Sequence, residues 1–259
     1  MRPPARRAAV LLAAAALLPA CGPGGGAAAT PDGAAGRTLT VFAAASLQGT
    51  FPAIGERFEA ANPGVDVRFG FAGSADLATQ ITEGAPADVF AAADEATMTA
   101  LEDRSLTAGD PVDFATNALR IATPAGNPAG VASFADLAAP GVDVVVCAPQ
   151  VPCGAATRAL EARSGVTLSP VSEESSVSGV LAKVTSGEAD AGLVYVTDVL
   201  AAGDRVTGIE VPGAADAANT YPVAALREAA DPALAAAFVA FVAGAEAQDV
   251  LRGAGFGAA

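Results

Sequence analysis

The feature that most constrains the fold of this chain is a regular alternation between two patterns of apolar residues, which begins at residue 38. From there, short apolar runs rich in β-branched residues alternate with segments whose apolar residues recur at helical spacing. Strands that alternate with helices favour βα units and mostly parallel sheets, so we expect an α/β protein. The 259 residues suffice for two such sheets. We expect strands at residues 38–44, 65–71, 88–92, 118–123, 142–148, 191–195, 208–211 and 221–226, and helices at residues 47–61, 75–83, 95–103, 154–164, 178–186 and 233–243.

The first twenty residues have the pattern of a secretory leader. Arg2, Arg6 and Arg7 precede an apolar run, and small residues follow before Cys21. The alternative is a membrane-spanning anchor, which needs ~20 apolar residues and therefore more than this run supplies. Residues 18–21 (Leu-Pro-Ala-Cys) resemble the bacterial lipobox, whose cysteine is lipidated. We therefore expect a leader at 1–20, a lipid anchor on Cys21, a flexible tether at 21–36 and a location outside the cytoplasm, on the membrane.

The composition excludes several functions. Histidine is absent, which rules out Ser-His-Asp and Cys-His catalysis and any zinc site built on imidazole. The net charge is −14, and loss of the leader removes three arginines and no acidic residue, which gives −17. Nucleic-acid binding needs clustered Lys and Arg, so we expect none. We expect a protein that is not an enzyme.

Two cysteines remain once Cys21 is lipidated. In an oxidising compartment Cys147 and Cys153 form either a disulfide or two buried thiols, and we favour the disulfide. It would close a short loop, stabilise the fold by about 2 kcal/mol and stiffen the turn that carries Cys153. The competing hypothesis is a thiol enzyme that uses Cys153 at a helix N-terminus.

Four strand-to-helix junctions share one chemistry. Each exposes the unpaired N–H groups and the positive dipole end of a helix, which together favour an anion. A serine at such a place is more often only a helix cap, but four junctions without a lysine or arginine favour a ligand held by neutral donors. The junctions carry Ser46, Ser74, Cys153 with Gly154, and Val177 with Gly179.

At these junctions the sequence resembles the molybdate-binding proteins of ABC transporters. Residues 41–47 (Val-Phe-Ala-Ala-Ala-Ser-Leu) and 84–94 (Gly-Ala-Pro-Ala-Asp-Val-Phe-Ala-Ala-Ala-Asp) carry the most specific motifs, and the likeness spans residues 38–256. The resemblance implies a two-lobed fold of the type II periplasmic-binding-protein kind, with the ligand in the cleft. Lobe 1 would comprise residues 37–117 and 216–259, and lobe 2 residues 118–215. Hinges are expected at 117–118 and at about 212–220.

The resemblance also implies the ligand contacts. Ser46 and Ser74 would donate through hydroxyl and main-chain N–H, Cys153 and Val177 through main-chain N–H, and Tyr195 through its phenol. Molybdenum would be bound only as its oxyanion, with no protein atom on the metal and no cofactor. A monomer would deliver molybdate, and tungstate as well, to the permease of an ABC importer.

Molybdate suits such donors because it is a fully deprotonated dianion whose oxygens only accept hydrogen bonds. A carboxylate in the site would repel it, whereas hydrogen phosphate keeps a proton that a carboxylate can accept. Glu173 or Glu174 turned inward would weaken this argument. Other oxyanions, such as sulfate or thiosulfate, and a surface lipoprotein without a ligand remain alternatives.

Overall fold

The computed structural model describes residues 36–259 of the chain. The predicted leader, the lipidation site Cys21 and the predicted tether up to residue 35 lie outside the described residues. Within residues 36–259, no single helix is both long and apolar enough to cross a bilayer.

The first sheet has five strands in the order β2-β1-β3-β10-β4. β1 pairs in parallel with β2 and β3, whereas β10 pairs antiparallel with β3 and β4. Its strands are β1 (Arg37–Ala44), β2 (Val65–Ala72), β3 (Val89–Ala91), β4 (Val112–Asn117) and β10 (Asn219–Ala225). The buried side chains of β1 include Leu39, Val41 and Ala43, which is the period-two pattern of a strand.

The second sheet has the order β7-β6-β8-β5-β9. β6 pairs in parallel with β7 and β8, and β5 pairs antiparallel with β8 and β9. The α/β class is confirmed, but both sheets are mixed and contain more antiparallel pairs than we predicted, because β10 and β5, which border the crossings between the sheets, run against their neighbours. The strands are β5 (Leu119–Pro124), β6 (Val144–Cys147), β7 (Ser172–Glu174), β8 (Ala191–Tyr195) and β9 (Val206–Ile209).

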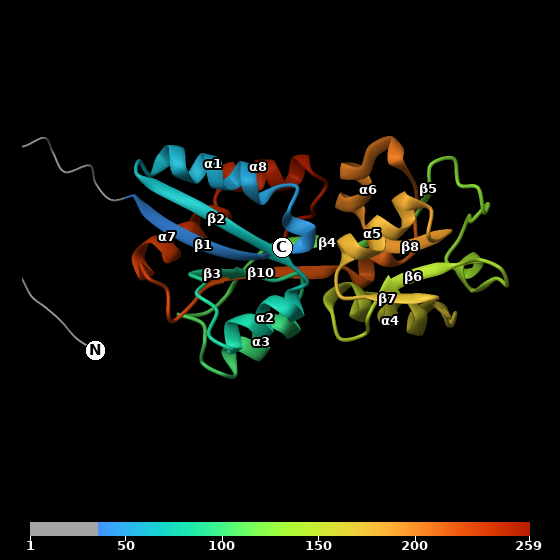
Figure 1. The fold of residues 1–259 in the computed structure, drawn as a ribbon, viewed down its shortest axis with the longest axis horizontal. Coiled ribbons are helices and arrows are strands. Elements are labelled where there is room, and N and C mark those ends of the chain that lie inside the picture. Colours follow the sequence, from blue (N-terminus) through green and yellow to red (C-terminus); the bar gives the residue numbers. More distant parts are fainter. Residues whose placement is uncertain (1–35) are drawn as a thin grey trace, which may run out of the picture. The chain divides into compact units, whose positions relative to one another are not determined.

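Helices cover both faces of the first sheet (Figure 1). α1 (Phe51–Ala61), α7 (Pro232–Val242) and α8 (Ala245–Gly253) share one apolar cluster with β1. α2 (Ser74–Thr82) and α3 (Glu95–Glu102) share another with Phe90 of β3. The helix predicted at 47–61 is divided into the 3-10 helix η1 (Ala45–Leu47) and α1, and Pro52 lies in the first turn of α1, where its missing N–H is harmless.

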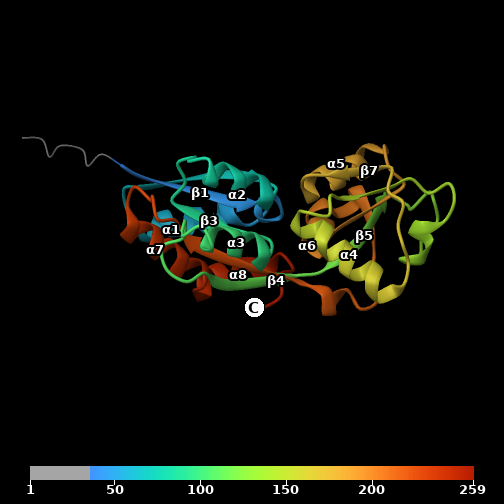
Figure 2. The same cartoon turned by 90° about the horizontal axis from the view of Figure 1, so that it is seen from below.

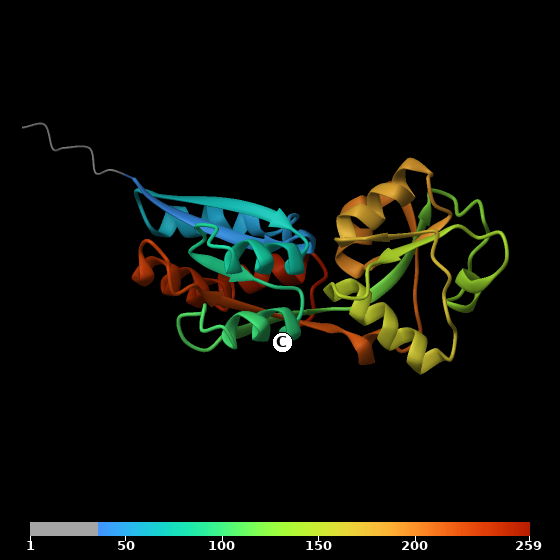
Figure 3. The ribbon, with the colours of Figure 1, turned by 60° about the horizontal axis from the view of Figure 1, so that its bottom comes forward.

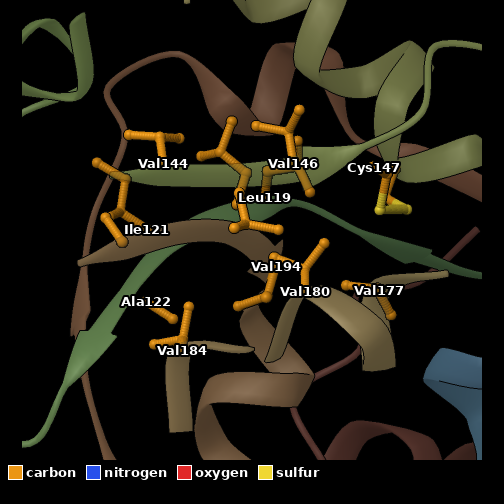
Figure 4. Close-up of a cluster of buried hydrophobic side chains, with 14 of the residues drawn as sticks. Leu119, Ile121, Ala122, Val144, Val146, Cys147, Val177, Val180, Val184 and Val194 are labelled. Carbon is orange, nitrogen blue, oxygen red and sulfur yellow. A yellow bond between two sulfur atoms is a disulfide. The ribbon is translucent and has the colours of Figure 1, made fainter. Parts of the chain in front are cut away.

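The second sheet has its own core. α4 (Pro152–Ser164), α5 (Val177–Ser186) and α6 (Val196–Ala202) pack on it. Figure 4 shows Val177, Val180 and Val184 of α5 beside apolar side chains of the strands, including Val194. Short 3-10 helices, η2 (Ala135–Ala138), η3 (Gly203–Arg205) and η4 (Ala214–Ala217), lie in the connections.

Two segments connect the sheets. The chain crosses from β4 to β5 at Ala118 and returns between β9 and β10, as the green and orange segments of Figures 2 and 3 show. The first residue of β10, Asn219, pairs with the last residue of β4, Asn117, so both crossings leave the first sheet at adjacent positions.

Candidate anion-binding site

All five residues predicted to contact a ligand line one cavity. The cavity is small: the centres of water-sized molecules can occupy about 20 Å³ of it, and its unfilled space is about 230 Å³ when the part open to solvent is included. The first-sheet side provides Ala44, Ala45, Ser46, Gly73, Ser74 and Ala93, and the second-sheet side provides Val151, Pro152, Cys153, Ser175, Ser176, Val177 and Tyr195. None of these lining residues carries a charged side chain, so any ligand that binds here is held by neutral groups.

Ser46 lies in η1, directly after β1. The end of β1 is buried, and the tight turn that follows brings the serine to the sheet edge. Its Oγ lies 3.0 Å from the hydroxyl oxygen of Tyr221, a buried residue of β10. When Tyr221 donates in this bond, the hydroxyl hydrogen of Ser46 is free for an acceptor in the cavity.

Ser74 is the first residue of α2, after the N-cap Gly73. The backbone N–H of Ala93 donates to Ser74 Oγ over 3.0 Å. Because that bond uses Ser74 Oγ as an acceptor, the hydroxyl hydrogen of the side chain can be donated elsewhere. Ser74 is buried, so the cavity is the place where an acceptor can reach it.

Cys153 and Val177 occupy the first turns of α4 and α5. The first four N–H groups of a helix have no partner within the helix, so both residues present main-chain donors. In α5 the Ser176 side chain accepts from Gly179 N–H, which leaves the Val177 N–H free of that cap. Both helix dipoles add positive potential at the cavity.

The turn before α4 is held tightly. Cys147 and Cys153 form a disulfide, so neither carries a free thiol. A Cβ on Gly154 would lie 1.9 Å from the carbonyl oxygen of Ala148, and only glycine lets the start of α4 pack so closely on the end of β6. The peptide of Cys153 is thereby fixed from both sides.

Tyr195 is the last residue of β8 and is 1% exposed. Its hydroxyl oxygen is one of two buried side-chain polar atoms among the described residues that have no hydrogen-bond partner. Burial raises the pKa of this phenol well above its usual range, so the hydroxyl keeps its proton and is a donor. Its ring packs edge-on against Tyr221, with centroids 6.0 Å apart.

The nearby carboxylates do not line the cavity. Glu174 accepts from Lys183 Nζ and from Ser172 Oγ, bonds that lower its pKa, and Glu173 also lies outside the lining. Asp198 accepts the N–H of Tyr195 over 2.8 Å, and burial raises its pKa to about 7. Neither Glu173 nor Glu174 therefore turns into the cavity, where it would repel an anion.

Sequence reasoning missed several members of the site. Ser175 and Ser176 directly precede α5 and are not among the predicted contacts, although two serines before a helix are a visible signal. Ala93 and Tyr221 gave no signal, because an alanine backbone and a strand tyrosine look like ordinary core. Within residues 36–259, no group of three or more His, Cys, Asp or Glu is placed to hold a metal ion.

Two α/β halves with a small cavity of neutral donors between them define a two-lobed solute-binding protein. The family model described as bacterial extracellular solute-binding protein matches residues 39–257, and the chain belongs to this family.

Named relatives agree with the class. The molybdate-binding protein ModA of Mycobacterium tuberculosis is 54% identical over 220 residues, which cover 85% of this chain and 84% of that protein. Among solved structures, the periplasmic molybdate-binding protein of Azotobacter vinelandii matches with a TM-score of 0.74 at 23% identity, over 84% of this chain and 98% of that one. The sulfate-binding protein SubI of Mycobacterium tuberculosis matches with a TM-score of 0.72 at 21% identity, over 85% and 86%.

Proposed function

We propose that this protein captures molybdate outside the cytoplasm and delivers it to an ABC importer. The observation that carries the proposal is the cavity itself, because its five candidate contacts are all donors and its lining holds no charge. The 54% identity to a molybdate-binding protein over most of both chains supports the same ligand.

The donor set favours a fully deprotonated anion over one that carries a proton. In the proposed complex, Ser46, Ser74 and Tyr195 donate hydroxyl hydrogens, and Cys153 and Val177 donate main-chain N–H groups. Hydrogen bonds to a charged acceptor contribute about 1.5–3 kcal/mol each, so a few of them suffice for tight binding. Hydrogen phosphate brings a proton that no lining carboxylate receives, which disfavours it. Tungstate has nearly the size and charge of molybdate and is expected to bind as well.

The alternative ligand is another tetrahedral oxyanion, such as sulfate or thiosulfate. The fold does not distinguish these ligands from molybdate, because a molybdate-binding protein and a sulfate-binding protein share it. Sulfate is smaller than molybdate, so a rigid cavity fitted to molybdate would leave some donors unpaired around sulfate. A thiol enzyme would need a free Cys153, whose sulfur is in a disulfide here.

Delivery follows from closure in this proposal. We assign residues 37–117 and 216–259 to one lobe and 118–215 to the other, with hinges at 117–118 and about 212–220. Each lobe holds part of the donor set, so the ligand favours the closed form by bridging both. The closed monomer, tethered through lipidated Cys21, then docks on the permease.

Calorimetry and thermal unfolding with a panel of anions test the proposal. Molybdate and tungstate should raise the melting temperature, since a ligand at 100 times its Kd stabilises by about 2.7 kcal/mol. Sulfate should bind more weakly, and phosphate should give no shift at the same concentration. A preference for sulfate would reassign the ligand, and no response to any of the four would contradict an oxyanion receptor.

A further inference from the structure

A buried asparagine joins the two walls of the cavity from behind. Asn219, the first residue of β10, is 8% exposed and does not line the cavity. Its Nδ2 donates to the carbonyl oxygen of Ala93 over 2.8 Å and to that of Pro152 over 3.3 Å. Both partners are carbonyl oxygens, which only accept, so the amide nitrogen must face them. One NH₂ group therefore bridges the first-sheet side and the second-sheet side.

Each carbonyl belongs to a backbone segment that serves a ligand contact. Ala93 also donates its N–H to Ser74 Oγ, which sets the direction of that hydroxyl. The carbonyl of Pro152 is in the same peptide unit as the N–H of Cys153. A hydrogen bond accepted by a peptide carbonyl polarises that peptide and strengthens its N–H as a donor. The bonds of Asn219 thus reach one candidate donor on each wall.

We infer that Asn219 is a positioning residue that holds the Ser74 and Cys153 donors in register for the anion when the two walls meet. The inference rests on the proposed function, since it concerns the same cavity. Its bond to Pro152 crosses between the two halves and can form only when they are close. Asn219 therefore favours the closed arrangement and also orients donors within it.

The chain supplies a control away from the cavity. Asn62 is a half-buried asparagine at the end of α1, and its Nδ2 donates to the carbonyl oxygen of Phe58 over 2.8 Å. Neither Asn62 nor Phe58 lines the cavity, so this bond carries no candidate donor. A general effect of losing an asparagine side-chain hydrogen bond should appear in both variants, whereas loss of positioning should appear at Asn219 alone.

The first measurement is molybdate affinity by calorimetry on the full chain. We expect Asn219→Ala to weaken binding roughly 10-fold, the effect of losing one or two neutral hydrogen bonds, and Asn62→Ala to weaken it less than about 3-fold. Asn219→Asp, which keeps the side-chain volume but lacks the NH₂ group, should show at least the loss of the alanine variant. This second variant is decisive where the alanine variant does not fold.

The second measurement is a spectroscopic signature that a purely structural role would not change. In protein saturated with molybdate, in which the halves are closed under this proposal, the Pro152 carbonyl ¹³C and Cys153 amide ¹⁵N resonances should shift in the Asn219 variants and stay in place in Asn62→Ala. Unchanged resonances, or equal affinity losses at both asparagines, overturn the inference. If the unaltered protein binds molybdate normally while both Asn219 variants keep its affinity, the inference is overturned and the proposed function stays intact. No molybdate binding by the unaltered protein overturns the proposed function and the inference with it.

Discussion

The serine hydroxyls of the cavity are oriented by groups that lie behind them. Ser74 Oγ accepts from the Ala93 N–H, and Ser46 Oγ pairs with the Tyr221 hydroxyl. A hydroxyl whose oxygen already accepts one bond has its hydrogen left to donate. Ser74 is therefore prepared as a donor, and Ser46 is prepared in the same way when Tyr221 donates in their shared bond.

We predict that Ser46→Ala and Ser74→Ala each weaken molybdate binding roughly 10- to 100-fold, because each loses a hydrogen bond to a charged acceptor. Val177→Ala should change the affinity little, because its main-chain N–H is the donor. Calorimetry on the three variants is the measurement. Equal losses in all three would show that the donors are misassigned.

Tyr195→Phe should separate affinity from stability. Its hydroxyl is buried without a partner in the described protein, so its removal relieves an unsatisfied polar group. We expect an unchanged or higher melting temperature without ligand and a molybdate affinity about 10-fold lower. Thermal unfolding and calorimetry on one preparation measure both. A fall in ligand-free stability with unchanged affinity would mean that the phenol is structural.

At the scale of elements, the strand ends that carry the site were predictable. The apolar runs that lead to Ser46 and to Tyr195 end in buried strand residues, the run before Ser74 is a mostly half-buried strand, and each is followed by a helical turn within two residues. A buried run bounded by a serine or glycine is a strong local signal, so these junctions could be found from sequence alone.

Other elements gave no such signal. β7 is the three-residue sequence Ser-Glu-Glu at a sheet edge, and β4 begins with the exposed Val112, so neither looks like a buried strand. α6 starts directly after Tyr195 without a loop, which hides its boundary. The role of Asn219 depends on two carbonyls distant in sequence, a relation that only the folded chain reveals.

The disulfide should act on the turn before α4. Residues 147 and 153 are six apart in sequence, and a loop this short restricts the unfolded chain by about 2 kcal/mol. We predict that Cys147→Ala with Cys153→Ala lowers the free energy of unfolding by about that amount. Denaturant unfolding measures it, with reduced unaltered protein as the control. Equal stability of the oxidised and reduced forms would contradict the prediction.

At the scale of the whole described chain, one glycine marks a close approach of the two halves. A Cβ built on Gly73 would lie 2.2 Å from the carbonyl oxygen of Ser175, on the opposite wall of the cavity. Gly73 has a φ of −57°, which alanine adopts without strain. An alanine there is therefore compatible with its own half and incompatible with the other half at this separation.

Gly73→Ala should consequently hold the walls apart. We predict a molybdate affinity at least about 10-fold lower, with little change in ligand-free melting temperature. Gly49→Ala is the control, because its Cβ would meet no atom within 4 Å. Calorimetry gives the affinity, and small-angle scattering with saturating molybdate tests closure. Full closure of the Gly73 variant would contradict this account.

The absence of lysine and arginine from the cavity lining bears on how cargo leaves. A lysine or arginine on one wall would continue to attract the anion even after the halves separate. Neutral donors divided between the two halves bind an anion tightly only when all of them reach it together. Water replaces them as soon as the halves separate. In the proposed function, release of the anion then needs no chemical step, because a membrane permease that separates the halves is enough to free it.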